Sequence, residues 1–399
     1  MNPDSVFTFT CPVKINSGNK ALENLPIELS GLNAGKPLIV TNIGKVGRTA
    51  IRTLTGAFGD SGMTLGVFDG LTDKVNPALI EQLRTTFIEE KFDSMIALGG
   101  GTIVDSAKVL NLAVSMKTVD VQSISAQTSI RKSLLPLVVV PTADANGLET
   151  SQQADLNGTV LSSEYLAPGL VVIDPRLTSG KDGKTIYATG LAVLGRALDA
   201  HISTENNPFR KAYSVAAIRF IKENLPVAVR NPDDKKATLA VINAAAMSGC
   251  AFSITDSSPL HKLGQVFHEV YNIHPGIIMG MCLPHILGDY LHQAGKDLSS
   301  LLYPLTGDDE LAQTPEAQKA GAAVSVLNRF MADLYSALGK DIPQTLKEAG
   351  VPYYVIEDIL EALDKDPDGV YLHTVVERIQ DKPQWLKRKA DSHGPSGLL

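Results

Sequence analysis

Three consecutive glycines, Gly99 to Gly101, stand between an apolar run at 94–98 and a helix-forming stretch at 102–108. Glycine lets a backbone approach a ligand closely, because no Cβ stands in the way. The start of a helix adds free N–H groups and the positive end of the helix dipole, which together hold a phosphate group. A tight turn that binds nothing could use the same residues. In its setting between strand and helix, the motif predicts the pyrophosphate site of a dinucleotide, NAD or NADP.

The elements around this turn have the pattern of a parallel sheet. Such a sheet is built from short apolar or β-branched runs that are buried on both faces and covered by helices. Runs of this kind stand at 37–41, 64–68, 94–98, 136–140 and 170–173. We therefore expect an α/β dinucleotide-binding domain over residues 1–175.

From about Thr185 onward the strand pattern fades and helical periodicity takes over. Helices are predicted at 186–225, 235–254, 258–270, 276–293, 315–339, 343–349 and 354–363. The segment from Leu170 to Pro175 is the expected join, and residues 176–399 are expected to form an all-helical domain. The active site would then lie in the cleft between the two domains.

Bulk composition excludes several classes of protein. The chain has 399 residues, of which 44% are hydrophobic and 20% charged, as in a soluble two-domain enzyme. The net charge of −7 argues against nucleic acid as a partner. No apolar run approaches the roughly 18 residues that would span a membrane, and the N-terminus does not read as a secretory signal. Cys11, Cys250 and Cys282 fit the reduced thiols of a cytoplasmic protein.

Several segments resemble the iron-containing (group III) alcohol dehydrogenase family. The decapeptide at 99–108, GGGTIVDSAK, resembles the family's GGGSxxDxAK signature, and PTADANGLE at 141–149 resembles PTTAGTGSE. VIDPRL at 172–177, Asn207-Pro208 and LPH at 283–285 resemble later landmarks. The resemblance implies the fold that this family shares with dehydroquinate synthase, and a nicotinamide-dependent oxidoreductase.

The resemblance also implies which residues hold the dinucleotide. The positions expected to contact the pyrophosphate or to lie beside the nicotinamide half are Gly100, Gly101, Thr102, Thr142 and Asn146. Asn42 stands where NAD-preferring relatives carry an aspartate, so the repulsion of a 2′-phosphate is removed and NADP becomes permitted. Asp105 would repel a phosphate, so we expect it to accept N–H groups of the glycine loop. Relatives place a lysine before the DPxL junction, which here is the VIDPRL segment at 172–177. No lysine stands between Ser133 and Gly180.

The family's metal ligands are largely missing. The resemblance implies an Asp and a His one helical turn apart, then two further histidines. Ala192, Arg196, His261 and Pro275 occupy those positions, and His274 stands one residue out of register. Alanine and proline have no donor atom, and arginine does not deprotonate in proteins. Catalytic iron or zinc needs about three protein ligands, so we expect no transition metal. A rebuilt site from His261, His268, His274 and Asp199 is the alternative.

Arg196 is the candidate for the role of the missing ion. A fixed guanidinium can stabilise an oxyanion or clamp a carboxylate. Asp199 lies on the same helical face, so a purely structural ion pair is the competing interpretation. Gln265 replaces a histidine of many relatives. His261 is then the best-placed acid or base near neutral pH, with His274 as the second candidate.

These features predict an NAD(P)-dependent alcohol dehydrogenase or carbonyl reductase that works without metal on a small polar or anionic substrate. Maleylacetate reductases, within the same superfamily, are the precedent for metal-free hydride transfer. A catalytically inactive nucleotide-binding or regulatory homologue and a dehydroquinate-synthase-like lyase or cyclase are the alternatives. We expect no nucleic acid and no membrane as partner, and a homodimer as in many relatives.

Overall fold

The computed structural model describes residues 7–116, 120–178, 181–202, 207–252, 259–271, 273–292, 298–363 and 369–380. Its first part is built on a six-stranded parallel sheet with the order β1-β8-β5-β4-β2-β3. The strands are β1 (Lys14–Ser17), β2 (Pro37–Val40), β3 (Gly66–Phe68), β4 (Ser94–Leu98), β5 (Leu137–Val140) and β8 (Leu170–Ile173). The predicted parallel sheet is confirmed.

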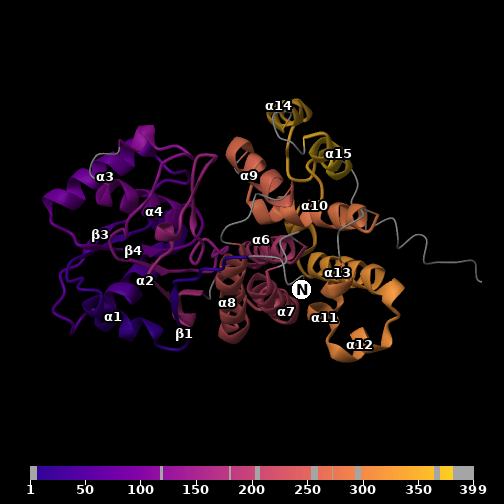
Figure 1. Ribbon diagram of the computed structural model, residues 1–399, viewed down its shortest axis with the longest axis horizontal. Coiled ribbons are helices and arrows are strands. Elements are labelled where there is room, and N and C mark those ends of the chain that lie inside the picture. The colour runs from indigo at the N-terminus through magenta and orange to yellow at the C-terminus, as the bar shows by residue number, and fades with distance from the viewer. Residues whose placement is uncertain are drawn as a thin grey trace, which may run out of the picture.

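Helices cover the sheet because its central strands are apolar on both faces. Every residue of β2, β4, β5 and β8 is buried, so neither face can be left to water. The covering helices are α1 (Leu25–Gly31), α2 (Ile43–Gly56), α3 (Pro77–Glu89) and α4 (Thr102–Ser115). Figure 1 shows this α/β part on the left and the later helices on the right.

Two β elements were not anticipated. Strand β1 is largely exposed at the edge of the sheet, so it has no apolar run that would mark it. Strands β6 (Gln153–Leu156) and β7 (Thr159–Ser162) form an antiparallel hairpin. Its turn is Asn157-Gly158, and both residues have positive φ angles of 51° and 85°. An Asn-Gly pair between two short runs is a strong hairpin signal, so this hairpin could have been predicted.

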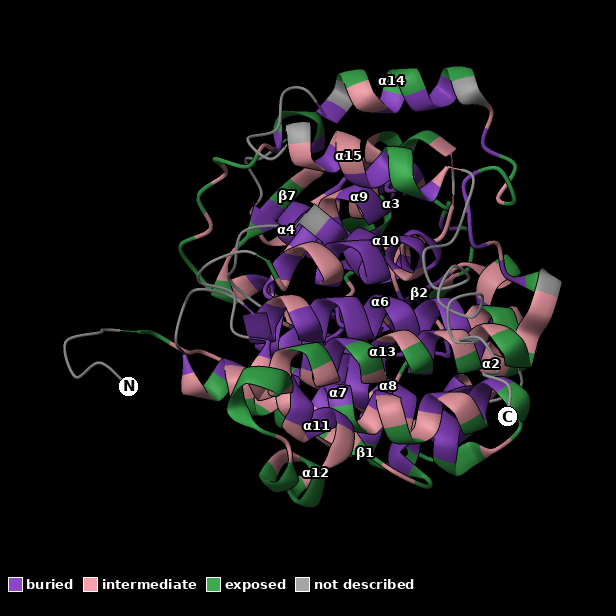
Figure 2. Ribbon diagram, turned by 90° about the vertical axis from the view of Figure 1, so that its right-hand side faces the viewer, coloured by how far each residue is buried: buried purple, intermediate pink, exposed green. Residues whose placement is uncertain are grey.

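The second part of the chain is helical, and its centre is formed by α6 (Gly183–Ile202) and α10 (Pro275–Tyr290). Both are buried along most of their length, and Figure 2 shows them in purple between more exposed helices. Around them lie α7 (Pro208–Arg230), α8 (Lys235–Phe252), α9 (Pro259–Tyr271) and α13 (Glu316–Leu338). The outer helices are α11 (Leu302–Thr306), α12 (Asp308–Gln313), α14 (Tyr353–Leu363) and α15 (Gly369–Ile379).

Some helix predictions need correction. The stretch 343–349 consists of turns and bends, because its few apolar residues form no helical stripe. The predicted helix at 186–225 is two helices, and α7 begins afresh at Pro208 with the Asn207 side chain as its cap. The short helices are α5 (Pro175–Thr178) and the 3₁₀ turns η1 (Ala21–Asn24), η2 (Val121–Ser123), η3 (Glu164–Leu166), η4 (Ser299–Leu301) and η5 (Gly339–Asp341). Among the described helices none combines the length and apolar character needed to cross a membrane.

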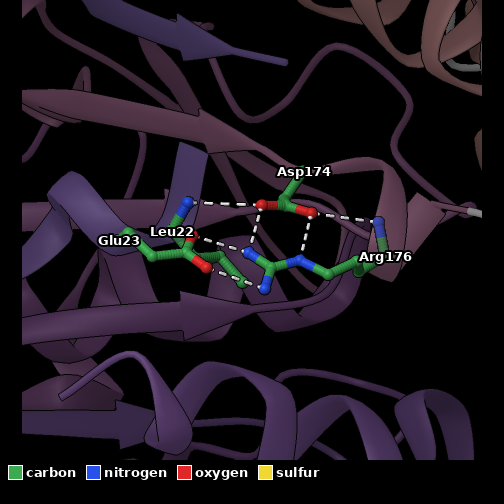
Figure 3. A network of polar contacts seen from close by, with 4 residues as sticks. All are labelled: Leu22, Glu23, Asp174 and Arg176. Atoms are coloured by element: carbon green, nitrogen blue, oxygen red, sulfur yellow. Dashed lines mark hydrogen bonds and ion pairs between the residues drawn. The ribbon is translucent and has the colours of Figure 1, made fainter. Parts of the chain in front are cut away.

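A charged network closes the end of β8, where the sheet gives way to the helices (Figure 3). The buried Asp174 carboxylate accepts hydrogen bonds from the Arg176 guanidinium at 2.8 and 2.7 Å and from the Leu22 N–H at 3.3 Å. Arg176 also forms two hydrogen bonds to Glu23, at 2.9 and 2.7 Å. All these groups are therefore paired, and the network fastens η1 to the chain that leaves the sheet.

Candidate active site

The glycine turn follows β4 and leads directly into α4. Gly101 is the N-cap of this helix, with φ 51° and ψ −125°, a conformation that L-residues with a side chain rarely adopt. A Cβ on Gly100 would lie 2.5 Å from the carbonyl oxygen of Asp144, so this glycine is needed for packing of the two loops. A Cβ on Gly101 would meet nothing within 4 Å. The open space above Gly101 and the uncapped start of α4 suit a phosphate.

A cavity of about 710 Å³ opens above this turn. It lies at the carboxyl ends of the parallel strands, where α/β sheets bind their ligands. Residues from the glycine turn, the loop after β5, the β6–β7 hairpin, α9 and the start of α10 line it. They are Lys45, Asp73, Lys74, Val75, Gly100, Gly101, Thr102, Asp105, Asp144, Asn146, Leu148, Asp155, Asn157, Lys181, Asp182, Thr185, Gln265, His268, His274 and Pro275.

Five of the residues predicted to serve the dinucleotide line this cavity: Gly100, Gly101, Thr102, Asp105 and Asn146. Thr102 donates its hydroxyl hydrogen to the carbonyl of Asp73 at 3.1 Å. Thr142 is buried and outside the lining. Its hydroxyl instead donates to the carboxylate of Asp144, which does line the cavity. Thr142 therefore positions a neighbour rather than presenting its own hydroxyl.

Asn42 also lies outside the cavity lining. Its side-chain oxygen caps α2 by accepting from the N–H groups of Gly44 and Lys45, at 2.9 and 3.2 Å. Lys45 itself reaches the cavity and pairs with Asp73 at 3.2 Å. Lys181 also lines the cavity and donates to the carbonyl of Lys45. The cavity thus has a lysine after the DPxL junction, in a chain that lacks the one expected before it.

Asp105 has a different partner from the one predicted. Its carboxylate accepts the N–H of Asp155 at 3.0 Å and so ties the hairpin to α4. The hydrogen bond between Asp105 and the glycine loop is made by its backbone N–H, which donates to the Gly101 carbonyl at 3.2 Å. Lys108, one turn further along α4, is fully buried and donates to the carbonyls of Leu148, Ser151 and Gln153 at 2.7–2.8 Å. The role of Lys108 in holding the 148–153 segment was not predicted from the sequence, although Lys108 belongs to the signature decapeptide.

The positions that the resemblance assigns to the metal ligands come together at one corner beside the cavity. Ala192 and Arg196 are one turn apart on α6, His261 lies on α9, and Pro275 begins α10. A Cβ on Gly276 would overlap the Ala188 carbonyl and would lie 3.0 Å from the Ala192 nitrogen, so α10 starts directly on α6. The ligand positions are thus gathered as the family requires, but the side chains there have changed.

Arg196 is only 3% exposed and does not line the cavity, so it is not placed to touch a substrate in the way expected of a residue that replaces the ion. Its Nε and Nη1 atoms have no hydrogen-bond partner within the described part of the chain, and its guanidinium lies 5.3 Å from the centre of the Phe252 ring. Burial lowers the pKa of Arg196, whereas the charges of Asp105 and Glu149, followed by Asp199 and Asp155, raise it. Arg196 is therefore an enclosed cation surrounded by carboxylates.

The histidines differ in their access to the cavity. His261 is buried edge-on against Phe252, and it does not line the cavity. Burial and the charge of Arg196 hold its pKa well below the usual range, so the prediction that it titrates near neutral pH is wrong. His274 does line the cavity, and its Nδ1 accepts the N–H of Gly276 at 3.1 Å. Burial lowers the pKa of His274 to about 4, so the neutral ring keeps its proton on Nε2.

Three carboxyl groups near this corner are shifted toward neutral pH. Burial and the charge of Asp155 raise the pKa of Asp105 to about 7. Burial raises the pKa of Glu149 to about 7, and its Oε2 accepts from Gly147 at 2.9 Å while Oε1 has no partner among the described residues. Burial also raises the pKa of Asp155, whose carboxylate accepts from Gln265 at 3.2 Å. Asp105 and Asp155 are the two of these that face the cavity.

Two family models match the chain. One, described as iron-containing alcohol dehydrogenase, matches residues 12–175, and the other, the C-terminal part of the Fe-containing alcohol dehydrogenase family, matches residues 186–366. The chain belongs to the iron-containing alcohol dehydrogenase family. Long-chain-alcohol dehydrogenase 1 of Geobacillus thermodenitrificans is 28% identical over 368 residues, 91% of this chain and 90% of that protein. The 1,3-propanediol dehydrogenase of Citrobacter freundii is 25% identical, over 73% and 75% of the two chains.

Solved structures of this family share the fold. A 1,3-propanediol oxidoreductase superposes with a TM-score of 0.83 at 22% identity, over 94% of this chain and all of the other. Maleylacetate reductase from Agrobacterium tumefaciens superposes with a TM-score of 0.74 at 18% identity, over 94% and 99%. The side chains of Ala192, Arg196 and Pro275 offer no donor atom to a metal ion. Across the described residues no group of three or more His, Cys, Asp and Glu side chains is arranged to hold one.

Proposed function

We propose that this chain is a nicotinamide-dependent oxidoreductase that interconverts an alcohol and a carbonyl compound without the family's metal. Relatives whose names state such reactions include an NAD-dependent methanol dehydrogenase and a 1,3-propanediol dehydrogenase. The observation that carries the proposal is the contrast at the cavity. The glycine turn is kept for a dinucleotide, while Arg196 lies beside Ala192 and Pro275 where a cation would be ligated.

A bound nicotinamide dinucleotide would give or take the hydride. The chain must then move one proton to or from the substrate oxygen. Asp105 is the group best placed to do this, because it faces the cavity and its pKa of about 7 lets it change charge near neutral pH. His274 complements it, because its Nε2–H can donate a hydrogen bond to the same oxygen. This assignment replaces His261 as the proton-carrying residue.

Arg196 acts on the cavity through its charge rather than by contact. Its guanidinium is enclosed, and after the N–H of Asp155 and the charge of Lys108 it favours the ionised form of Asp105. A charge in a site that excludes water has a larger effect than the same charge in solvent. Together with Lys108 and the N–H of Asp155, Arg196 therefore offsets part of the effect of burial on Asp105 and helps that carboxyl group to ionise. In this role Arg196 is a positioning residue, and Asp105 is the catalytic one.

The charged residues that line the cavity influence which substrates it can bind. A small polar or anionic substrate was predicted from Arg196, but Asp105 and Asp155 face the cavity whereas Arg196 does not. A carboxylate-bearing substrate would be repelled by these two groups. A neutral polyol or an amino alcohol would instead find acceptors in them. The proposal is therefore a small polar substrate without negative charge, and Asp155→Asn should improve turnover of anionic substrates relative to neutral ones.

The decisive experiment measures metal content and turnover on the same purified protein. Alcohol oxidation is assayed with NAD⁺ and NADP⁺ on 1,3-propanediol, butanol and choline, and carbonyl reduction is assayed with NADH and NADPH on sulfoacetaldehyde, all substrates named for relatives. We expect less than stoichiometric iron or zinc, and activity that is unchanged by a chelator. The variant Ala192→Asp/Arg196→His/Pro275→His rebuilds the ligand set and serves as the positive control for metal uptake. Stoichiometric metal in the unaltered protein, with activity lost on chelation, would refute the metal-free mechanism.

A pH profile tests the role of Arg196. Arg196→Met keeps much of the side-chain volume but removes the charge, so the pKa of Asp105 should rise and the pH dependence of turnover should shift upward. Asp199→Asn is the comparison variant, since it removes a charge that acts on Arg196 from the same helix but outside the cavity lining. An unshifted profile in Arg196→Met would contradict this role. Tight dinucleotide binding with no turnover on any substrate would instead favour the inactive-homologue interpretation.

A further inference from the structure

The N-terminal segment 7–13 lies against the helical part of the molecule and is fixed there by several contacts. The carbonyl of Thr10 accepts a hydrogen bond from the Gln152 side chain at 2.6 Å. The Phe9 ring stacks on the rings of Phe209 and Tyr213, with centres 5.5 and 5.8 Å away. These contacts place Cys11 directly over α8.

The Cys11 Sγ lies 3.2 Å from the Sγ of Cys250, a residue 239 positions later in the sequence. This is within the distance of an S–H···S hydrogen bond. Cys11 is partly exposed, whereas Cys250 is buried in α8. A partly exposed cysteine beside a buried one is the arrangement of a reactive and a resolving cysteine.

The surroundings of Cys11 favour its thiolate. The hydrogen bond with Cys250 is the largest influence and lowers the pKa of Cys11. Burial opposes it, and hydrogen bonds from the Val13 N–H and the Tyr213 hydroxyl add to it, so the pKa is about 7. The hydrogen bond with Cys11 and burial raise the pKa of Cys250. At neutral pH a substantial share of Cys11 is thus the nucleophilic form, beside a protonated Cys250.

We propose that Cys11 and Cys250 are a redox-sensitive pair that a hydroperoxide converts into an intramolecular disulfide. The Cys11 thiolate attacks the peroxide oxygen, so an S–O bond forms, the O–O bond breaks, and water or an alcohol leaves. The Cys250 sulfur then attacks the Cys11 sulfur, so the S–S bond forms and the S–O bond breaks. The proton of Cys250 leaves with the departing oxygen as water. Two electrons pass from the two sulfurs to the peroxide, and a dithiol such as dithiothreitol reduces the disulfide to two thiols while it is itself oxidised to a disulfide.

The bond would connect the segment before β1 to a helix that supports the candidate active site. Within α8, Ala246 accepts a hydrogen bond from the Thr150 hydroxyl at 2.6 Å, and Thr150 follows the loop that lines the cavity. A link between residues so far apart in sequence restricts the unfolded chain strongly. We therefore expect the oxidised protein to unfold at a temperature several degrees higher than the reduced protein.

Cys282 supplies a matched control within the same chain. It is buried in α10, and burial raises its pKa. Peroxide should therefore leave Cys282 unmodified. Because the chain has three cysteines in all, counting free thiols separates the pair from this residue.

The test treats the reduced full-length protein with hydrogen peroxide and counts thiols after denaturation. Peroxide should lower the count from three to one, with loss of two hydrogen atoms in the intact mass and a bridged Cys11–Cys250 peptide. After peroxide treatment, the variant Cys282→Ser should lose both of its thiols, because Cys11 and Cys250 pair. The variant Cys11→Ser should keep both of its thiols, because Cys250 then has no partner. Dithiothreitol should restore the thiols and the lower unfolding temperature. An unchanged count, a Cys11 that only gains oxygen, or disulfide-linked dimers on a non-reducing gel would each overturn the proposal.

Discussion

The glycine turn and the corner around Arg196 differ in what determines their chemistry. At the turn, the conformation of the backbone determines what can bind, because Gly100 packs against the Asp144 carbonyl and Gly101 leaves space open. At the corner, side chains decide the chemistry, and three ligand positions carry Ala192, Arg196 and Pro275. A fold can therefore keep its dinucleotide-binding turn while substitutions in its helical part change the chemistry at the substrate.

The largest expected effect tests whether the chemistry has moved to Asp105. Asp105→Asn keeps the acceptor for the Asp155 N–H but cannot exchange a proton, so turnover should fall by about a thousandfold. In the unaltered protein, alcohol oxidation should rise with pH through about 7, as Asp105 loses its proton. Asp144→Asn is the control, since Asp144 also lines the cavity. Full turnover by Asp105→Asn would reduce Asp105 to a structural acceptor.

The second largest expected effect is on dinucleotide binding at the glycine turn. Gly101→Val places a branched side chain where the pyrophosphate is expected, so NADH affinity should fall by roughly a hundredfold, about 2.7 kcal/mol. Fluorescence titration measures it. Gly62→Val is the matched control, because Gly62 also has a positive φ, of 71°, and open space around it. Equal NADH affinity in folded Gly101→Val and in the unaltered protein would place the pyrophosphate elsewhere.

A third comparison sets Arg176 against Arg196, since Arg176 is fully hydrogen-bonded and distant from the chemistry. Arg176→Ala removes the hydrogen bonds from a partly exposed guanidinium to the buried Asp174, which should lower the free energy of unfolding by about 2–3 kcal/mol without changing turnover. Guanidinium denaturation measures this loss. Arg219→Ala, which removes an exposed pair to Glu223, should leave the midpoint unchanged. A turnover loss in stable Arg176→Ala would contradict the division between a structural and a functional arginine.

This stability difference should depend on pH. Burial would raise the pKa of Asp174, but the hydrogen bonds from Arg176 outweigh it and hold the pKa below the ordinary value near 4. A carboxyl group with a lowered pKa stabilises the fold above its unfolded pKa and loses that effect as the pH falls through its folded pKa. The gap between the unaltered protein and Arg176→Ala should therefore narrow below about pH 4.

The smallest effect concerns cofactor choice. With Asn42 in place, NADPH should bind within about tenfold of NADH, roughly 1.4 kcal/mol. Asn42→Asp keeps the cap of α2, because aspartate caps equally well, and adds a charge that should weaken NADPH about tenfold. Asn76→Asp is the control, since Asn76 caps α3 in the same way. Unchanged NADPH affinity in Asn42→Asp would point to Lys45 as the residue that meets the ribose end.

The sequence was most informative where a local pattern fixes the structure. The buried strands and the glycine turn were predicted because their apolar runs and glycines are needed in any sheet of this kind. Strand β1 was not, since an exposed edge strand carries no apolar run. Helical spacing placed His261 on the right helix but could not show that Phe252 and Arg196 enclose it. The approach of Cys11 to Cys250 could not be predicted, because their separation of 239 residues leaves no local signal.

Helix α8 packs closely against the loop after β5, and this contact limits which substitutions or insertions could change the shape of the cavity. A Cβ on Gly249 would overlap the Gly147 carbonyl and the Thr150 hydroxyl, so neither side tolerates insertion or bulk. The Asn157-Gly158 turn of the β6–β7 hairpin is exposed and less constrained, because Asn157 reaches the cavity and a single side-chain hydrogen bond among the described residues, to the Val75 carbonyl at 2.8 Å, holds it there. A library that varies the length of this hairpin turn should therefore yield new substrate preferences more readily than one that varies the loop.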